Sequence, residues 1–351
     1  MSEDGLIRRL WAGLFGGWAN AALTSALLVG AWFALEPIIR WALIDATWTG
    51  DAKACAEQDG ACWAFVGAKL RFILFAFYPF DEHWRAAAAL ALLLTLLVLL
   101  ATPRFWSAWL APLSLVLLAG ACVLLGGWPG ATDVPSSQWG GLPLSLLVTI
   151  ASLSLGFPIG LALALGRRSD LPVPRWLCAA YIELVRGTPL IAVLYLAMLA
   201  MPLALPPGIE LDKLVRGLIA MALFFAAYFA EIIRAGLQGL PDSQTEAALA
   251  LGFSRIGALR HVVLPQALRA VMPALVTLAI GVLQSTTLLA AIGIFDLLNA
   301  SRAAANDPAW LGFYDEAYAF AALIYFALCF GASRYGVWLE KRLNRASEGV
   351  R

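Results

Sequence analysis

Apolar stretches long enough to cross a lipid bilayer recur along almost the whole chain. Of its 351 residues, 62% are hydrophobic and 13% are charged, and the mean hydropathy is +0.80. A soluble domain is closer to half apolar and a quarter charged, whereas a bilayer core needs about 20 apolar residues per helix. The sequence therefore predicts an all-α integral membrane protein, with too few residues between spans for a large soluble domain.

Eight spanning helices are expected, three before a linker rich in Gly, Pro and Ser near residue 130 and five after it. Residues 1–130 would form an N-terminal three-helix membrane extension with a long loop at 45–84. Residues 131–351 would form a transmembrane core with a loop at 238–271. The expected spans are 18–43, 85–101, 109–125, 142–166, 178–201, 214–235, 272–298 and 317–339.

The lysines and arginines of the short loops predict the orientation, because they gather on the cytoplasmic side of a membrane. They place both termini and the loop 238–271 inside and the loop 45–84 outside. A ninth span at the apolar segment 70–80 would break this pattern. Its 11 residues are short for a span, so we expect it to be interfacial or re-entrant. The basic residues on the predicted inner side are Arg8, Arg9, Arg104, Arg167, Arg168, Arg175, Arg255, Arg260, Lys341, Arg342, Arg345 and Arg351.

A polar island, EAALALGFSRIGALRHVVLP, runs from Glu246 to Pro265. Ser243 stands three residues before Glu246, which predicts a capping box in which each side chain accepts from the other's backbone N–H. Gly252 permits the left-handed turn that would end this first helix. Ser254 is expected to cap a second helix, and Pro265 would end that helix because it has no N–H.

The island has two interpretations. The first is a well-capped connecting loop, because capping boxes are common. The second is a contact surface for another protein, because the small side chains of Ala247 and Ala248 let another surface approach closely and the loop is long for a connection between neighbouring helices. The second interpretation gains most of its weight from a resemblance. The island resembles the EAA loop of permease subunits in ABC importers, which has E-A-A, a Gly six residues after the Glu, an aliphatic residue ten further on and a closing L-P; these places are taken here by Glu246-Ala247-Ala248, Gly252, Val262 and Leu264-Pro265.

The resemblance extends over residues 136–340, which are similar to the polar amino-acid permeases, the family of the histidine and glutamine permeases. The stretch ELVRGTPL at 183–190 matches that family's E-x-x-R-G-T-P-L, and YFAEIIRAG at 228–236 matches its Y-x-A-E-x-x-R-x-G. The N-terminal third, with RFILFAFYPFDEHWR at 71–85, resembles the general L-amino-acid permeases. A departure is the stretch QSTT at 284–287, where many relatives have Lys-Asp-Thr-Ser.

The resemblance implies a type I ABC importer permease core of five helices in a bacterial inner membrane. It implies L-amino acids as substrates and alternating access as the mechanism. The implied partners are an ATPase dimer that binds ATP and Mg²⁺, a periplasmic amino-acid-binding protein, and a similar but non-identical second permease subunit. Coupling to the ATPase would use Ser243, Glu246, Ala247, Ala248, Gly252, Leu264 and Pro265.

Polar residues inside the expected spans are candidates for the solute pathway. Four of them are consecutive in the seventh span and cannot all face one neighbouring helix, because each residue turns the helix by about 100°. Hydrogen bonding between helices is the alternative explanation. The candidates are Gln284, Ser285, Thr286 and Thr287, with Thr149, Ser152, Tyr195 and Tyr228 as weaker ones.

Two charged pairs lie near the inner ends of the expected spans. Glu183 and Arg186 are three residues apart, as are Glu231 and Arg234, so each pair can form an ion pair on one helix. They are either structural ion pairs or parts of a cytoplasmic gate, with Arg186 a candidate contact for a solute carboxylate. Pro189 is expected to kink the span that follows the first pair.

Other classes of function fit less well. The chain has no Gly-rich phosphate loop, no basic block for nucleic acid, and two histidines on opposite sides, so neither enzyme chemistry nor a metal site is expected. An ion-coupled secondary amino-acid transporter is the main alternative, with Glu231 as its candidate coupling residue. A structural scaffold is a third. Cys55 and Cys62 share the loop 45–84, where either a disulfide or two free thiols would fit.

Overall fold

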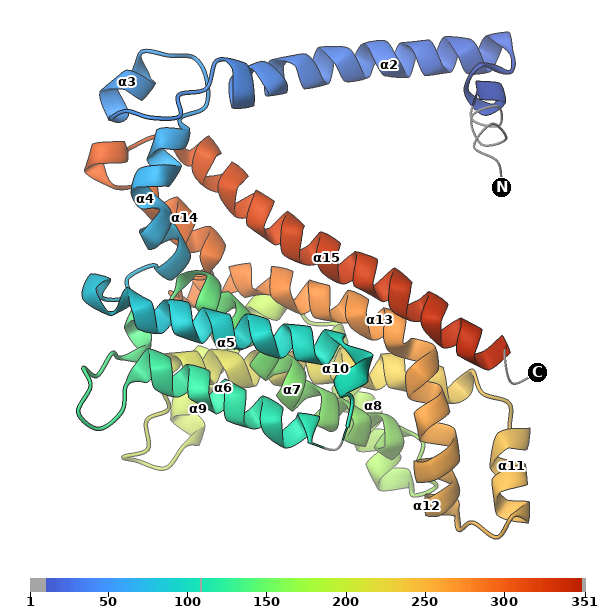
Figure 1. The fold of residues 1–351 in the computed structure, drawn as a ribbon. Coiled ribbons are helices and arrows are strands. Elements are labelled where there is room, and N and C mark those ends of the chain that lie inside the picture. Colours follow the sequence, from blue (N-terminus) through green and yellow to red (C-terminus); the bar gives the residue numbers. More distant parts are fainter. Residues whose placement is uncertain (1–10, 108, 349–351) are drawn as a thin grey trace. The chain divides into compact units, whose positions relative to one another are not determined.

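The computed structural model describes residues 11–107 and 109–348, except for the side chains of 344–348, and these residues are almost entirely helical (Figure 1). The orientation argument also used Arg8, Arg9, Arg351 and the side chain of Arg345, which lie outside this description. Within the described residues, β-structure is limited to two isolated bridges, Thr47–Cys62 and Gly141–Asp296. The predicted all-α membrane fold is confirmed.

Six described helical segments are long and apolar enough to cross a membrane. They correspond to six of the eight expected spans. The first is α2 (Trp18–Ile39) with a π-helical end at Arg40–Ile44, and the others include α5 (His83–Ala101), α7 (Gly141–Arg167), α10 (Lys213–Gln238), α13 (Leu264–Ser285) and α15 (Tyr314–Glu348). The expected span at 109–125 is α6 (Leu110–Gly126), which is apolar but only 17 residues long.

The expected single span at 178–201 is wrong in shape. It consists of α8 (Pro172–Arg186) and α9 (Leu190–Ala204), whose axes are bent by 109°. Pro189 precedes α9 with extended backbone angles. Because proline has no N–H and its ring disfavours a helical residue before it, the helix stops at this position instead of only kinking.

The expected span at 272–298 is also different. The helix α13 begins at Leu264, before the expected start, and ends at Ser285, where it passes into a 3₁₀-helix at Thr286–Ile292. The hydroxyls of Thr286 and Thr287 donate to carbonyls three residues before them, those of Leu283 and Gln284. These bonds compete with the α-helical pattern. Gly293, with a φ of 70°, ends the 3₁₀-helix, and the short α14 (Leu297–Ala304) follows.

The segment 70–80 does not contain a helix long enough to span. The helix α4 (Trp63–Phe75) has 13 residues and ends before Ala76, which has a φ of 52°. Tyr78 then donates a hydrogen bond of 2.8 Å to the carbonyl of Leu125 at the end of α6. An interfacial or re-entrant position for this segment stays a prediction.

The chain divides into two compact units. One consists of the described residues up to Lys69 together with Ala305–Ala317, and the other of Leu70–Ala304 and the described residues from Tyr318 onward. The predicted domain boundary near residue 130 stays a prediction. The smaller unit contains a closely bonded segment that we call the head, residues 45–69 with 305–317, which includes α3 (Ala52–Ala56).

Three kinds of contact hold the head together. Cys55 and Cys62 form a disulfide, which decides between the two alternatives left open by their spacing. The backbone N–H of Cys62 donates 2.8 Å to the buried carboxylate of Glu316, and Lys69 pairs with Asp307 at 2.7 Å. The hydrogen bond from Lys69 holds the pKa of the Asp307 carboxyl below its usual value.

In the larger unit, α7 lies against α10 over much of its length (Figure 1). Gly160 allows the closest approach, because a Cβ atom there would lie 2.4 Å from the Cβ of Phe229. Small residues at such crossings let membrane helices pack closely. A buried cluster around Phe229 and Ile233 extends from α7 and α8 through α10 to Ala267 of α13. These contacts set α10 and α13 beside one another, where the candidate site lies.

Candidate transport cavity and coupling loop

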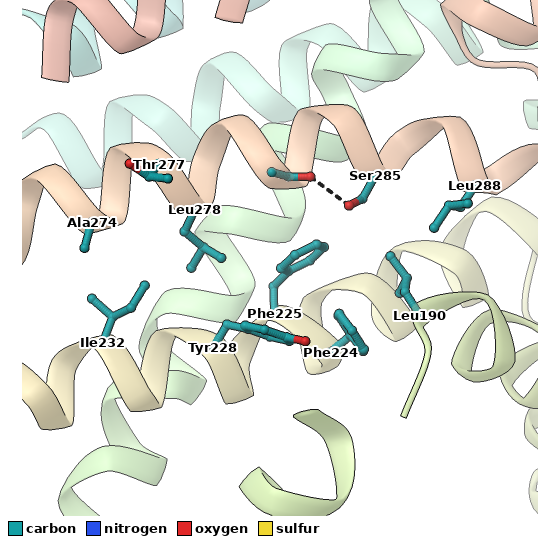
Figure 2. Close-up of a pocket in the computed structure, with 11 residues that line it drawn as sticks. Leu190, Phe224, Phe225, Tyr228, Ile232, Ala274, Thr277, Leu278, Ser285 and Leu288 are labelled. Carbon is teal, nitrogen blue, oxygen red and sulfur yellow. Dashed lines mark hydrogen bonds between the residues drawn. The ribbon is translucent and has the colours of Figure 1, made fainter. Parts of the chain in front are cut away.

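A cavity of about 690 Å³ lies between α9, α10 and α13. Figure 2 shows α10 and α13 facing one another across it, with Tyr228 on the first and Ser285 on the second. Its wall is mainly apolar, and its polar groups are the hydroxyls of Thr277, Ser285 and Tyr228. A mostly apolar hollow with a few placed polar groups is the usual form of a small-molecule site.

Only two of the predicted pathway residues line this cavity, namely Tyr228 and Ser285. The Ser285 hydroxyl donates 2.7 Å to the carbonyl of Gly281, so its oxygen keeps lone pairs for a solute. Sequence reasoning missed Thr277. The signal was available, because Thr277, Gly281 and Ser285 recur every four residues and thus share one face of a helix.

The other predicted pathway residues bond within the protein or lie elsewhere. Thr286 and Thr149 are both buried, and the Thr149 hydroxyl donates a hydrogen bond of 2.7 Å to the carbonyl of Ser145. Ser152 is buried without a hydrogen-bond partner. The exposed Gln284, along with Thr287 and Tyr195, is not part of the cavity wall. Helix packing accounts for Thr149 and Thr286 better than contact with a solute does.

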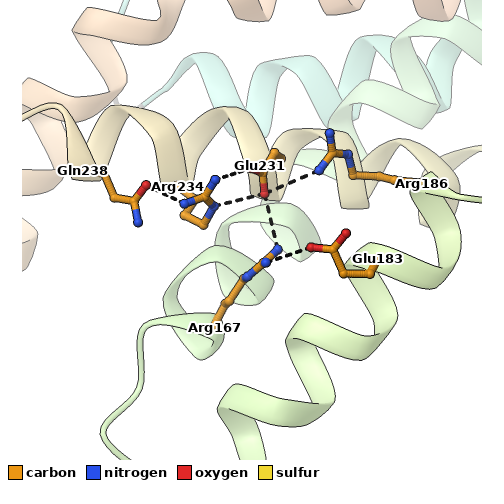
Figure 3. Close-up of polar contacts among 6 residues, drawn as sticks. All are labelled: Arg167, Glu183, Arg186, Glu231, Arg234 and Gln238. Carbon is orange, nitrogen blue, oxygen red and sulfur yellow. Dashed lines mark hydrogen bonds and ion pairs between the residues drawn. The ribbon is translucent and has the colours of Figure 1, made fainter.

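An ion cluster joins α7, α8 and α10 (Figure 3). Glu231 is its centre and contacts three guanidinium groups: Arg234 on its own helix, Arg167 at 3.4 Å and Arg186 at 3.7 Å. The pair Glu231–Arg234 is therefore as predicted. The guanidinium of Arg186 also lies 5.9 Å from the ring of Tyr228, which connects the cluster to the cavity wall.

The predicted pair Glu183–Arg186 is wrong. The structure records no ion pair between these two described residues, and Glu183 instead pairs with Arg167 of α7 at 2.8 Å. Arg186 is the last residue of α8 and reaches toward Glu231 of α10 (Figure 3). Helical spacing alone cannot choose between a partner on the same helix and one on a neighbouring helix. The result is three arginines with two glutamates, a cluster with one excess positive charge.

The first helix of the island, α11 (Ser243–Ala250), does not have the predicted capping box. Its N-cap is Asp242, whose side chain makes no capping bond, and the N–H of Glu246 donates to the Asp242 carbonyl at 3.1 Å. The N–H that Ser243 was expected to bind is therefore already used. The Glu246 carboxylate is exposed and has no bonding partner within the described chain. It is thus free to act on another protein.

The remaining boundaries of the island agree with the sequence except at its end. Gly252 has a φ of 87°, and the Ser254 hydroxyl accepts from the N–H of Gly257 at 3.1 Å, which starts α12 (Arg255–Ala258). Pro265 does not stop the second helix. A π-helical segment at Leu259–Val263 joins α12 to α13 in one continuous helix, and Pro265 lies directly after this segment.

The two serines of the island should therefore differ in their effect on stability. Ser254→Ala removes a real N-cap bond, so we expect it to lower the free energy of unfolding by about 1 kcal/mol. Ser243→Ala removes no cap and should change it by less than about 0.5 kcal/mol. Thermal melting, together with limited proteolysis at the loop, measures both. An equal effect of the two substitutions would contradict the observed caps.

The island exposes large apolar side chains, and only one of the two alanines of the predicted contact surface is exposed. Ala248 is only 3% exposed because it packs inside the loop, whereas Ala247 is exposed. The exposed apolar side chains are led by Leu251 at 80% and Ile256 at 78%, followed by Leu249 and Phe253. Apolar side chains gathered on a polar loop indicate a binding surface for another protein.

Comparison with known proteins identifies this arrangement. Residues 156–345, more than half of the chain, match the family described as binding-protein-dependent transport system inner membrane component. The chain belongs to this family. The permease is 40% identical over 343 residues to the inner membrane amino-acid ABC transporter permease protein YhdY of Escherichia coli (strain K12), covering 94% of this chain and 91% of that protein.

Two further relatives support the assignment. The permease is 34% identical over 414 residues to the glutamate/glutamine/aspartate/asparagine transport system permease protein BztC of Rhodobacter capsulatus, with coverage of 98% and 95%. A crystal structure of an amino acid ABC transporter with histidines matches with a TM-score of 0.51 and 32% identity, covering 57% of this chain and 92% of that one. The predicted family, its core fold and a role as a membrane-spanning transport subunit are confirmed.

Proposed function

We propose that this permease carries L-amino acids inward across the bacterial inner membrane by alternating access, driven by a partner ATPase dimer. The cavity between α9, α10 and α13 would hold the solute. The observation that carries the proposal is that the island exposes two large apolar side chains, Leu251 and Ile256, and the unpaired carboxylate of Glu246. In this proposal α11 rides in a groove of one ATPase subunit and transmits its closure to α13, which continues from the island into the cavity wall.

Three partners complete the proposed transporter. The ATPase dimer would bind ATP and Mg²⁺, and we assign no cofactor to the permease. A periplasmic amino-acid-binding protein would deliver the solute. The resemblance to general L-amino-acid permeases supports a similar but non-identical second permease subunit in the complex. The test is isolation of the complex through a tag on this chain, followed by reconstitution and measurement of ATP-driven uptake of labelled amino acids.

The ion-coupled alternative is not favoured. Its candidate coupling residue, Glu231, contacts three guanidinium groups. A carboxylate so engaged is not a free titratable group in the pathway. If the isolated complex took up amino acids with an ion gradient and without ATP, the alternative would replace our proposal.

The proposed orientation has both termini and the island in the cytoplasm and the head in the periplasm. The Cys55–Cys62 disulfide supports it, since disulfides persist in oxidising compartments. Along the sequence, α5, α6, α7, the bent pair α8 and α9, and α10 separate residue 69 from the island. If each crosses the membrane once, counting the bent pair as one, the number of crossings is odd, which agrees with this orientation.

Thiol labelling tests this orientation. In intact cells, we expect a membrane-impermeant maleimide to label Cys55 and Cys62 only after reduction of the disulfide, because the head faces the periplasm. A cysteine placed at exposed Leu251 should react only after the inner membrane is opened. Labelling of the Leu251→Cys chain in intact cells would contradict the orientation.

A further inference from the structure

A buried carboxylate outside the cavity belongs to a hydrogen-bond network that neither the ion cluster nor the island uses. Asp296 is fully buried and lies just before α14. Its oxygens accept from the backbone N–H groups of Leu298 at 3.3 Å and Asn299 at 3.1 Å. These two bonds are those of a helix N-cap, and they explain why an acidic residue begins α14.

Two further donors are not required for a cap. The Tyr325 hydroxyl of α15 donates 2.8 Å to Asp296, and the side-chain amide of Asn299 donates to the same carboxylate. No cation contacts Asp296 among the described residues. Its charge is therefore balanced by four hydrogen-bond donors, two of which come from side chains that also reach another helix.

That other helix is the end of α13. The Tyr325 hydroxyl contacts the hydroxyl of Thr286 at 3.4 Å; this is a packing contact, because the two protons go to Asp296 and to the carbonyl of Leu283. The Asn299 amide supplies the hydrogen bond, donating 3.2 Å to the carbonyl of Thr287. Thr286 and Thr287 are the residues at which α13 changes into the 3₁₀-helix. The cavity-lining residues Ser285 and Leu288 lie immediately before and after them.

A third side of the network involves α7. The Ser145 hydroxyl accepts from the N–H of Leu297 at 3.1 Å, and the N–H of Gly141 donates 2.9 Å to the carbonyl of Phe295. The segment around Asp296 is thus fixed to α7 on one side and to α13 and α15 on the other. Buried networks whose members are all satisfied hold one geometry.

We propose that Asp296 is a positioning residue for transport. Through Tyr325 and Asn299 it fixes the change of helix type at Thr286–Thr287, and so sets where Ser285 and Leu288 stand in the cavity wall. The proposal rests on the cavity being the solute path, as proposed above. A plain helix cap needs only the two backbone N–H donors. The positioning role of Asp296 depends on the two side-chain donors, Tyr325 and Asn299.

The test uses two tyrosines of α15. Tyr325→Phe removes the hydroxyl that donates to Asp296 and contacts Thr286, without touching the cap. Tyr335→Phe is the matched control, because the Tyr335 hydroxyl is buried and has no hydrogen-bond partner. Both are made in the full complex, and thermal melting is recorded for each. The wall is probed directly in a chain with Ser285→Cys and with its free cysteines Cys122, Cys178 and Cys329 replaced by alanine.

We expect Tyr325→Phe to raise the labelling rate of Ser285→Cys by a small methanethiosulfonate reagent about tenfold, the effect of losing one hydrogen bond to a charged group. We expect a similar fall in ATP-driven uptake by the chain that retains Ser285. Tyr335→Phe should leave both within about twofold. Unchanged labelling in Tyr325→Phe, or an equal change in the two variants, overturns the proposal.

The labelling rate does not depend on transport, so it separates this proposal from the proposed function. If the wild-type complex showed no ATP-driven uptake, the function would fail while the labelling result still reported on the wall. A labelling change in Tyr325→Phe with wild-type uptake would overturn the positioning role. As a second variant, Asn299→Ala removes the link to Thr287 and should raise labelling in the same direction; no change there would also count against the proposal.

Discussion

Leu251→Asp in the island should abolish ATP-driven uptake and release the ATPase, while the permease stays folded. The side chain is 80% exposed, so a charge there should change the free energy of unfolding by no more than about 0.5 kcal/mol. In a complex, burial of a leucine contributes about 1.5–3 kcal/mol. Since 1.4 kcal/mol is a tenfold change in affinity, the loss of this contact alone should weaken ATPase binding about 10- to 100-fold.

The measurement is the amount of ATPase that copurifies with a tagged permease, together with uptake in proteoliposomes. Ile256→Asp should give the same result, because Ile256 is 78% exposed on the same loop. Leu251→Met keeps an apolar side chain and should retain the ATPase. Leu311→Asp places the same charge at an exposed leucine of the head, and should leave the ATPase bound. A complex that keeps its ATPase with Leu251→Asp would disprove the role of this surface.

This docking surface shows how far the sequence predicted the site. The motif located the loop, and Gly252 and Ser254 have the roles expected of them. The motif did not identify the exposed face, because the Ala248 side chain is buried whereas those of Leu251 and Ile256 are exposed to solvent. Which side of a short helix is buried depends on what packs against it, and here that is the following π-helical segment, far beyond the reach of local capping rules.

The helices themselves were predicted where the apolar runs were long, as for α7 and α10. The breaks were harder to predict. Pro189 marked a change of direction, but a bend of 109° depends on how α8 and α9 pack on α10. The 3₁₀-helix after Ser285 follows from two threonine hydroxyls bonding to nearby carbonyls, and the same sequence also fits a continuous span. Composition identifies an apolar helix but does not distinguish these geometries.

The ion cluster illustrates the same limit through long-range contacts. Its glutamates and two of its arginines were predicted from spacing within one helix. Arg167 was not, because it lies at the end of α7 and meets Glu183 and Glu231 only through the fold. Because Arg167 and Arg186 also contact it, Glu231 links α7, α8 and α10, whereas the sequence predicted only a pair within one helix.

Glu231→Gln should therefore destabilise the permease more than any other single change in the cluster. It leaves three guanidinium groups near an amide, with Glu183 as their only remaining carboxylate in the cluster. Removing one partner of a buried ion pair costs about 3–5 kcal/mol, and the 22% exposure of Glu231 lowers our expectation to on the order of 2 kcal/mol. We expect Tm to fall by several degrees and uptake to fall with it.

Glu183→Gln is the matched control, because it removes the same charge from a side chain that is 62% exposed and pairs only with Arg167. An exposed pair contributes about 0–1 kcal/mol, so its Tm should change little. Equal Tm shifts in the two variants would show that Glu231 is not the centre of the cluster.

A second substitution separates charge balance from transport. The only ion pair of Arg186 in the described chain is with Glu231, so Arg186→Gln combined with Glu231→Gln removes one excess positive charge and should recover at least half of the lost stability. The guanidinium of Arg186 also lies 5.9 Å from the ring of Tyr228, a residue of the cavity wall. If it serves as a gate or contacts a solute carboxylate there, uptake should stay low in the double variant although Tm recovers. Recovery of both would instead make the cluster a structural brace between α7, α8 and α10.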